Sequence, residues 1–245
     1  MKNIETNLIK KVVYQETDYL SEYKLANLLS VMADLATDNA IEIGMWNEKL
    51  NGQYGWVLSK QILKLSRPIQ LEENIKISTR AKGGSRVQFM RTYDIENHDE
   101  KIGGAYSVWT LIDIKNRRIV KPHQAGLELP EIEEYDCYVD KFEPVLRNIE
   151  TKKIMERQVL YNDVDVNQHM NNSKYIEWAL DLLPYQDHQN SYIEQLSMHY
   201  RKEIAPLTFV ELYYGQENKD FKIEFKVDDT VCFEMSGKQK ERRKC

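Results

Sequence analysis

Residues 22–43 read EYKLANLLSVMADLATDNAIEI, and their apolar side chains recur at helical spacing. The recurring positions are Leu25, Leu28, Leu29, Met32, Leu35 and Ala36. Because this spacing puts the six side chains on one face, the stretch predicts a helix with one buried stripe. Ser21 is a candidate N-cap residue, and Gly44 stands where a glycine commonly ends a helix.

Four segments that alternate between apolar and polar residues follow this helix. They are residues 56–66, 74–81, 86–96 and 105–114. In the third segment, for example, Val87, Phe89, Tyr93 and Ile95 fall on one side of an extended chain. Turn-forming residues such as Gly83-Gly84 separate the segments, so the pattern predicts four consecutive strands.

The same order of elements occurs a second time. The short apolar segments KVVY (11–14) and RQVLY (157–161) predict a strand before each helix, and the second helix is expected from Ser173 to Leu183, before Pro184. Strand-like segments at 192–201, 207–215, 220–228 and 230–236 complete the second set. Residues 122–150 contain prolines and a run of acids without a clear period, which predicts a linker.

A repeated unit of one helix and an antiparallel sheet buries its apolar surface by wrapping the sheet around the helix. We therefore expect an α+β protein of two tandem hot-dog domains, each an antiparallel sheet around a long helix, packed as an internal pseudo-dimer. The predicted boundaries are 1–125 for the N-terminal domain, 126–150 for the linker and 151–245 for the C-terminal domain.

Composition excludes several classes of protein. The net charge is -5, so the chain-wide basic footprint of a nucleic-acid binder is missing. No stretch approaches the roughly 20 apolar residues of a membrane span, and the first residues do not resemble a signal peptide. The three cysteines, Cys137, Cys232 and Cys245, have neither metal-ligand nor disulfide spacing. We expect a cytoplasmic protein.

The densest polar cluster is YNDVDVNQHMNN at 161–172, directly before the second helix. Asp165, Asn167 and His169 are spaced by two, so in an extended segment they would point to one side. Exposed N–H groups at a helix start favour a developing oxyanion, and histidine can transfer protons near neutrality. A well-capped polar loop without chemistry would have a similar composition. The matching residues 15–21 contain neither His nor Asn, so the duplicated scaffold does not require them.

The run DVDVNQHMNNSKYIEWAL (163–180) closely resembles the signature of plant and bacterial fatty acyl-ACP thioesterases. In that family an Asp-x-Asn-x-His loop precedes a helix that reads Asn-Asn-x-x-Tyr-x-x-Trp. Residues 198–203, MHYRKE, are similar to the family's Tyr-Arg-Arg-Glu strand. The resemblance extends over about residues 10–236.

The resemblance implies catalytic roles for Asp165, Asn167, His169 and Glu203. It also implies hydrolysis of the thioester of fatty acyl-acyl-carrier protein, which releases free fatty acid and ends fatty acid synthesis. The first half would supply the acyl pocket, and no cofactor is implied. Ile204 replaces a cysteine that is frequent in the family, so a Cys–His mechanism cannot run through it. An activated water and an attacking carboxylate both stay open.

Two other functions stay open from the sequence, a hot-dog acyl-CoA thioesterase and a non-catalytic acyl-binding module, because a fold does not define a function. Homodimer formation is also left open. An acidic carrier protein would favour a basic docking surface. The basic clusters are Lys115, Arg117, Arg118 and Lys121; Arg147, Lys152 and Lys153; and the tail 238–244.

Overall fold

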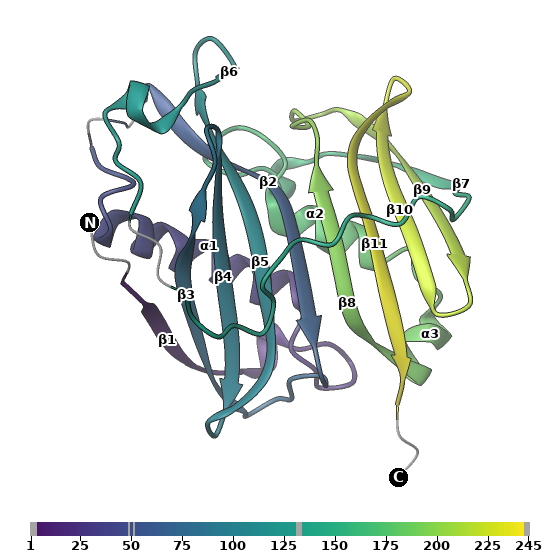
Figure 1. The fold of residues 1–245 in the computed structure, drawn as a ribbon. Helices are drawn as coiled ribbons and strands as arrows, with labels where there is room; N and C mark the ends of the chain where they lie inside the picture. The colour runs from purple at the N-terminus through teal and green to yellow at the C-terminus, as the bar shows by residue number, and fades with distance from the viewer. Residues whose placement is uncertain (1–3, 49, 51, 131–133, 243–245) are drawn as a thin grey trace. The chain divides into compact units, whose positions relative to one another are not determined.

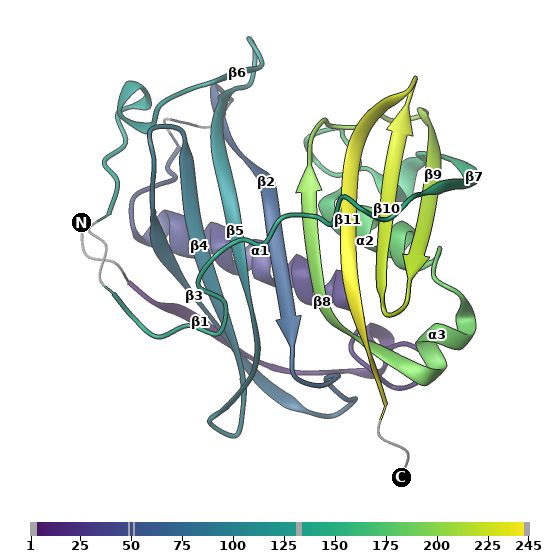
Figure 2. The ribbon, with the colours of Figure 1, turned by 45° about the vertical axis from the view of Figure 1, so that its right-hand side comes forward.

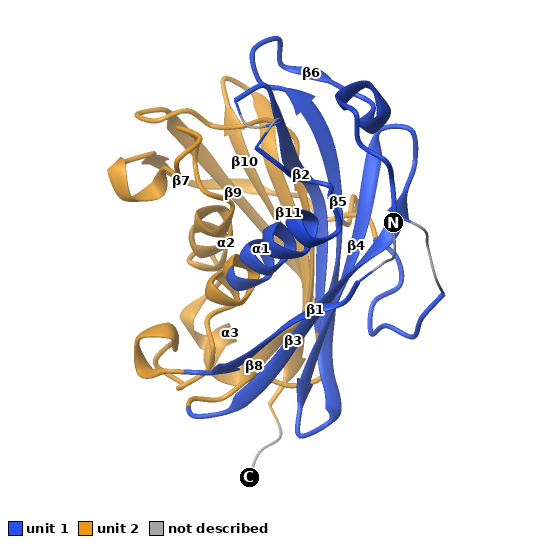
Figure 3. Cartoon of the chain, turned by 90° about the vertical axis from the view of Figure 1, so that its left-hand side faces the viewer, with its two compact units in different colours: residues 1–12, 31–64, 72–142 blue, residues 13–30, 65–71, 143–245 orange. Residues whose placement is uncertain are grey.

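The computed structural model of this chain describes residues 4–48, 50, 52–130 and 134–242. Its described residues divide into two compact units (Figure 3). The first contains residues 1–12, 31–64 and 72–142, and the second contains residues 13–30, 65–71 and 143–245. Helix α1 (Leu25–Glu42) contributes residues to both units.

The first unit is a sheet against which the C-terminal part of α1 packs. Its strands are β1 (Thr6–Lys11), β2 (Tyr54–Leu65), β3 (Asn74–Gly84), β4 (Gln88–Asn97), β5 (Glu100–Asp113) and β6 (Arg118–Ile119). The order is β1-β3-β4-β5-β2, with β6 paired to β5, and the β1–β3, β3–β4 and β4–β5 pairs are antiparallel. Figure 1 shows α1 behind these strands. Met32, Leu35 and Ala36 are buried on its inner stripe, as the helical spacing predicts.

The second unit repeats this arrangement around a shorter helix. Its elements are β7 (Lys152–Gln158), α2 (Asn172–Leu180), α3 (Tyr185–Asn190), β8 (Ser191–Tyr200), β9 (Phe209–Glu217), β10 (Asp220–Val227) and β11 (Thr230–Glu241). The strand order is β8-β11-β10-β9-β7, and each neighbouring pair is antiparallel. The ring of Tyr175 on α2 lies 5.1 Å from that of Phe233 on β11. A sheet packed on one helix in each unit confirms the α+β hot-dog prediction.

The predicted linker packs against the sheets for most of its length. In the first unit, residues 134–142 cross the outer face of the sheet (Figures 1 and 2), and Val139 is buried there against Ile62 and Tyr106. In the second unit, the backbone N–H of Leu146 donates to Ser236 Oγ at 3.0 Å. The segment is therefore packed structure, with residues up to 142 in the first unit and residues from 143 in the second. The domain boundaries at 125 and 150 stay a prediction.

Several element predictions are wrong in detail, and the first strand of each half is misplaced in the same way. Strands β1 and β7 end at Lys11 and Gln158, whereas residues 11–14 and 157–161 were expected to be extended. The short 3-10 helices Tyr14–Glu16 and Tyr161–Asp163 begin there instead. Helix α1 begins at Leu25, so Ser21 is not its N-cap residue. Helix α3 was missed, because its six residues carry no apolar stripe.

Candidate active site

The loop 161–171, here named the second loop, holds three of the predicted site residues in a closed turn. The N–H of Asp165 donates to the carbonyl of His169 at 3.0 Å, and the N–H of Gln168 donates to the carbonyl of Asp165 at 3.0 Å. Oδ1 of Asp165 accepts from the backbone N–H of Asn167 at 2.8 Å. The prediction of an extended segment is therefore wrong, because the Asp165 side chain bonds its own backbone two residues on.

His169 and Glu203 face each other beside this turn. Their Nε2 and Oε2 atoms are 3.4 Å apart, and their side chains are 27% and 36% exposed, so water can reach both. The N–H of Met170 donates to the carbonyl of Ile204 at 2.9 Å, which fastens the second loop to the segment after β8. A carboxylate at this distance can orient the imidazole ring.

The second loop leads directly into the N-terminus of α2. Oδ1 of Asn171 accepts from the backbone N–H of Ser173 at 2.9 Å, so Asn171 is the N-cap residue. The first N–H groups of a helix lack intrahelical partners, and together with the helix dipole they favour negative charge. An imidazole, a carboxylate and a helix start therefore lie within one stretch of the second unit, and Asn167 is exposed on the same loop.

Asp163, to which no role was assigned from the sequence, is 7% exposed. Its Oδ2 atom accepts from the backbone N–H of Leu160 at 2.9 Å, and its Oδ1 atom accepts from Nε1 of Trp178 at 3.2 Å. Its backbone carbonyl accepts from the N–H of Asn171 at 2.8 Å. One buried residue therefore connects the start of the second loop, its end and the core of α2.

Residues 14–24, here named the first loop, repeat the backbone of the second loop. The N–H of Asp18 donates to the carbonyl of Glu22 at 2.9 Å, and Oδ1 of Asp18 accepts from the N–H of Leu20 at 2.8 Å. Ser21 has a φ of 61° and Gln168 one of 62°, at the same position of each turn. The turn chemistry is therefore common to both halves.

The first loop lacks the reactive side chains of the second. The N–H of Tyr23 donates to the carbonyl of Ile69 at 2.7 Å, which is the counterpart of the bond between Met170 and Ile204. This register identifies the equivalent positions: Leu20, Glu22 and Pro68 correspond to Asn167, His169 and Glu203. Glu22 forms an ion pair with Arg242, whose Nη2 atom donates to Oε2 at 2.8 Å. Only the second loop combines an imidazole with a facing carboxylate.

Other polar candidates lie outside this site. His199 faces Glu234 on the neighbouring strand, with Nδ1 and Oε1 3.3 Å apart, while its neighbours Met198 and Tyr200 turn toward α2. Burial raises the pKa of the Cys137 thiol, so the thiolate that a nucleophile needs is disfavoured. Cys232 is buried, and Cys245 lies outside the described residues.

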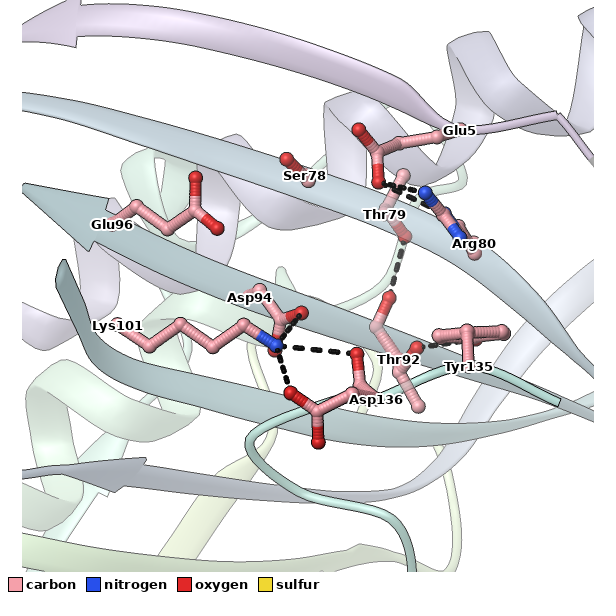
Figure 4. A pocket seen from close by; sticks show the side chains of 10 residues that line it. All are labelled: Glu5, Ser78, Thr79, Arg80, Thr92, Asp94, Glu96, Lys101, Tyr135 and Asp136. Carbon is pink, nitrogen blue, oxygen red and sulfur yellow. Dashed lines mark hydrogen bonds and ion pairs between the residues drawn. The ribbon is translucent and has the colours of Figure 1, made fainter. Parts of the chain in front are cut away.

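A polar cleft of about 190 Å³ lies on the first unit, beside the segment that crosses its outer face (Figure 4). Its charged groups bond one another: Lys101 lies 2.9 Å from Asp136, and Arg80 lies 2.6 Å from Glu5. The hydroxyl of Tyr135 is 2.6 Å from that of Thr92. The Lys101–Asp136 and Thr92–Tyr135 contacts fasten the crossing segment to the sheet, and no predicted site residue lines the cleft.

The described ranges contain no group of three or more His, Cys, Asp or Glu side chains that could hold a metal ion. Within the same ranges, no helix is long and apolar enough to cross a membrane.

Two family models match the chain in tandem. The model of the acyl-ACP thioesterase N-terminal domain matches residues 8–124, and that of the acyl-ACP thioesterase C-terminal domain matches residues 146–242. The chain belongs to the acyl-ACP thioesterase family. The second loop and Glu203 lie within the C-terminal match, and the first loop lies within the N-terminal match.

Relatives of this chain include plant proteins. It is 28% identical to the palmitoyl-acyl carrier protein thioesterase, chloroplastic, of Cuphea hookeriana over 167 residues, which are 64% of this chain and 40% of the relative. The oleoyl-acyl carrier protein thioesterase, chloroplastic, of Coriandrum sativum is 25% identical over 164 residues, 60% of this chain and 43% of the relative. The chain spans less than half the length of these curated relatives.

Solved structures share the fold of this chain over nearly its whole length. An acyl-ACP thioesterase from Bacteroides thetaiotaomicron has a TM-score of 0.86 at 22% identity and covers 96% of this chain, with 98% of its own chain matched. The 12:0-ACP thioesterase from Umbellularia californica has a TM-score of 0.79 at 13% identity. It covers 97% of this chain, with 98% of its own chain matched. At these identities the likeness shows the fold alone.

Proposed function

We propose that this chain hydrolyses the thioester of fatty acyl-acyl-carrier protein and releases free fatty acid and the carrier thiol. The observation that carries the proposal is the His169–Glu203 pair, 3.4 Å apart and partly open to water, beside the capped N-terminus of α2. A base, an orienting carboxylate and an oxyanion-stabilising helix start are the groups that acyl transfer to water requires. Membership of the acyl-ACP thioesterase family supports the fatty acyl-carrier substrate.

In this scheme, water attacks the thioester carbonyl carbon while the His169–Glu203 pair takes its proton. Negative charge develops on the carbonyl oxygen, which the first N–H groups of α2 stabilise. The tetrahedral intermediate then collapses, the C–S bond breaks, and the sulfur leaves as a thiol by taking the proton back. Asn167 positions the substrate or the water. No step requires a redox reagent or a second substrate.

We assign Asp165 to positioning rather than to nucleophilic attack. Its Oδ1 atom is already engaged by the N–H of Asn167 at 2.8 Å. Asp18 makes the equivalent bond to Leu20 in the first loop, which has neither the imidazole nor the facing carboxylate. A bond that both loops make supports folding of the turn, whereas the chemistry depends on groups that only the second loop has.

For carrier docking, we propose the hairpin that joins β5 to β6. Lys115, Arg117 and Arg118 are exposed on it and can attract an acidic carrier protein. In the second cluster, Lys153 is held by Glu211 at 2.5 Å and by Glu156 at 3.3 Å.

The basic tail, residues 238–244, is a weaker docking candidate. Lys240 is bonded to Glu194 at 2.8 Å, and Arg242 is bonded to Glu22, while residues 243–245 lie outside the described residues. A cytoplasmic location, which the scattered cysteines support, stays a prediction that cell fractionation tests. Homodimer formation also stays a prediction, and light scattering tests it.

The testing experiment compares hydrolysis of a panel of acyl-carrier proteins with hydrolysis of the matching acyl-CoAs. We expect wild type to prefer the carrier substrates, and His169→Ala and Glu203→Gln each to lower kcat by at least about 100-fold. Equal or better turnover of acyl-CoA would indicate an acyl-CoA thioesterase. Binding of acyl chains without turnover would indicate an acyl-binding module, and near-full activity of both variants would contradict the scheme.

A further inference from the structure

Asp163 is a buried carboxylate that the proposed reaction does not use. Its side chain accepts two hydrogen bonds, one from the backbone of Leu160 and one from the indole N–H of Trp178, which is 1% exposed. No ion pair of Asp163 occurs among the described residues. Burying a carboxylate is costly unless hydrogen bonds replace its water, so the indole N–H is a necessary partner.

The first loop shows what the same turn needs when it carries no imidazole. Glu16 corresponds to Asp163, and its Oε2 atom accepts from the backbone N–H of Val13 at 3.3 Å. Its carbonyl accepts from the N–H of Lys24 at 3.0 Å, as that of Asp163 does from Asn171. The residue equivalent to Trp178, counted 15 positions further along, is Val31, which has no side-chain donor.

A bond from the side chain at this helix position to the carboxylate is therefore not common to the two loops. The bond between Asp163 and Trp178 occurs in the loop that holds His169, whereas Val31, at the position that corresponds to Trp178, has no side-chain donor. A contact that the turn does not require, but that accompanies the imidazole, points to a role in placing the imidazole.

We propose that Asp163 and Trp178 are a positioning pair that fixes the second loop on α2 and so holds His169 against Glu203. The pair acts at both ends of the loop. The Asp163 side chain holds Leu160 before the turn, its carbonyl holds Asn171 after the turn, and Trp178 ties both to the buried face of the helix. This role rests on the proposed hydrolysis, because positioning is useful only if His169 reacts.

The first test replaces Trp178 by Phe, which keeps an aromatic ring and removes the N–H. We expect kcat to fall by about tenfold, the effect of one hydrogen bond to a charged group, while KM changes less than about twofold. The matched control is Trp56→Phe, which removes an indole bond of 2.9 Å to the carbonyl of Met45. The control should leave kcat unchanged. Equal kcat values for wild type and Trp178→Phe would overturn the proposal.

A second variant, Asp163→Glu, copies the first loop, where a glutamate folds the same turn. It should remain folded and lose kcat to a similar extent, because the longer side chain cannot keep both the Leu160 and Trp178 bonds. A variant with full activity would show that the spacing between the carboxylate and the indole does not matter, which contradicts the positioning role.

Amide hydrogen exchange separates this proposal from the proposed function. In Trp178→Phe, the amides of Asp165, Gln168 and Met170 should exchange faster, while those of Asp18, Ser21 and Tyr23 keep their wild-type rates. This readout needs no substrate. If wild type hydrolysed no acyl-carrier protein but the selective exchange were seen, only the function would fail. If exchange were unchanged, the positioning pair would fail whatever the activity.

Discussion

Replacing Asp165 by Asn distinguishes a carboxylate that reacts from one that folds the second loop. Asn keeps an oxygen that can accept the N–H of Asn167, now 2.8 Å away, and loses only the charge. A hydrogen bond to a charged group is worth about 1.5–3 kcal/mol and a neutral one about 0.5–1.5 kcal/mol. The two kinds of bond differ by about 1 kcal/mol. If the turn positions the site, Asp165→Asn should therefore lower kcat by only about fivefold.

Asp165→Ala removes the acceptor altogether. The turn then loses about 2 kcal/mol of stabilisation, which corresponds to a roughly thirtyfold lower kcat if the turn positions the site. Asp18 supplies the matched control, since its Oδ1 atom accepts from the N–H of Leu20 at 2.8 Å and from that of Glu22 at 3.0 Å. Asp18→Asn and Asp18→Ala should lower the free energy of unfolding at least as much as the Asp165 variants, without the same loss of kcat.

The assay measures kcat with one acyl-carrier substrate and unfolding in urea for all four variants. A nucleophilic carboxylate would give a different pattern, because neither Asn nor Ala can attack a thioester. Both Asp165 variants would then lose roughly 10³-fold or more while their unfolding matched that of the Asp18 variants. That result would refute the positioning role of Asp165 and restore the attacking carboxylate.

Three further predictions concern stability and reactivity outside the second loop. A hydrogen bond from His199 lowers the pKa of Glu234 to about 2, so the carboxylate stabilises the fold above its unfolded pKa of about 4.3. The difference in unfolding free energy between wild type and Glu234→Gln should be constant from about pH 7 to 5 and shrink as the pH falls toward 2; a difference that grew on acidification would contradict this. Cys137 should react with a maleimide at neutral pH more slowly than free cysteine, since burial raises the pKa of its thiol; equal rates would refute this. Gly215→Ala should lower the free energy of unfolding by about 1–3 kcal/mol, because the added methyl group would overlap with the carbonyl oxygen of Glu150; an unchanged urea midpoint would mean that residues 143–150 do not pack on β9.

Elements with a strong period were predictable from the sequence. The stripe from Leu25 to Ala36 identified α1 to within three residues at its start, and Gly44 has the left-handed φ of 71° expected after a helix. Edge strands were not predictable, because β1 and β7 are mostly polar and owe their extended form to pairing with β3 and β9. The apolar residues that follow them, Val12 and Val159, are buried beyond the strand ends.

The four site residues came from a motif, but their arrangement did not follow from spacing. Alternation in Asp-Val-Asp-Val-Asn suggests a strand, yet the Asp165 side chain closes a turn there. The facing of His169 and Glu203 depends on contacts between segments 34 residues apart, which no local pattern encodes. Asp163 was overlooked because the sequence alone does not show that it is buried beside Trp178.

The two loops of this chain have an implication for how such enzymes change over time. When two identical subunits are encoded by one gene, every substitution in a loop appears in both copies at once. Fusion of the two halves into a single reading frame ends that restriction. In this chain Glu22 occupies the position that corresponds to His169 and binds Arg242, while the other loop carries the imidazole. The first loop therefore shows which residues form the turn where neither the imidazole nor the facing carboxylate is present.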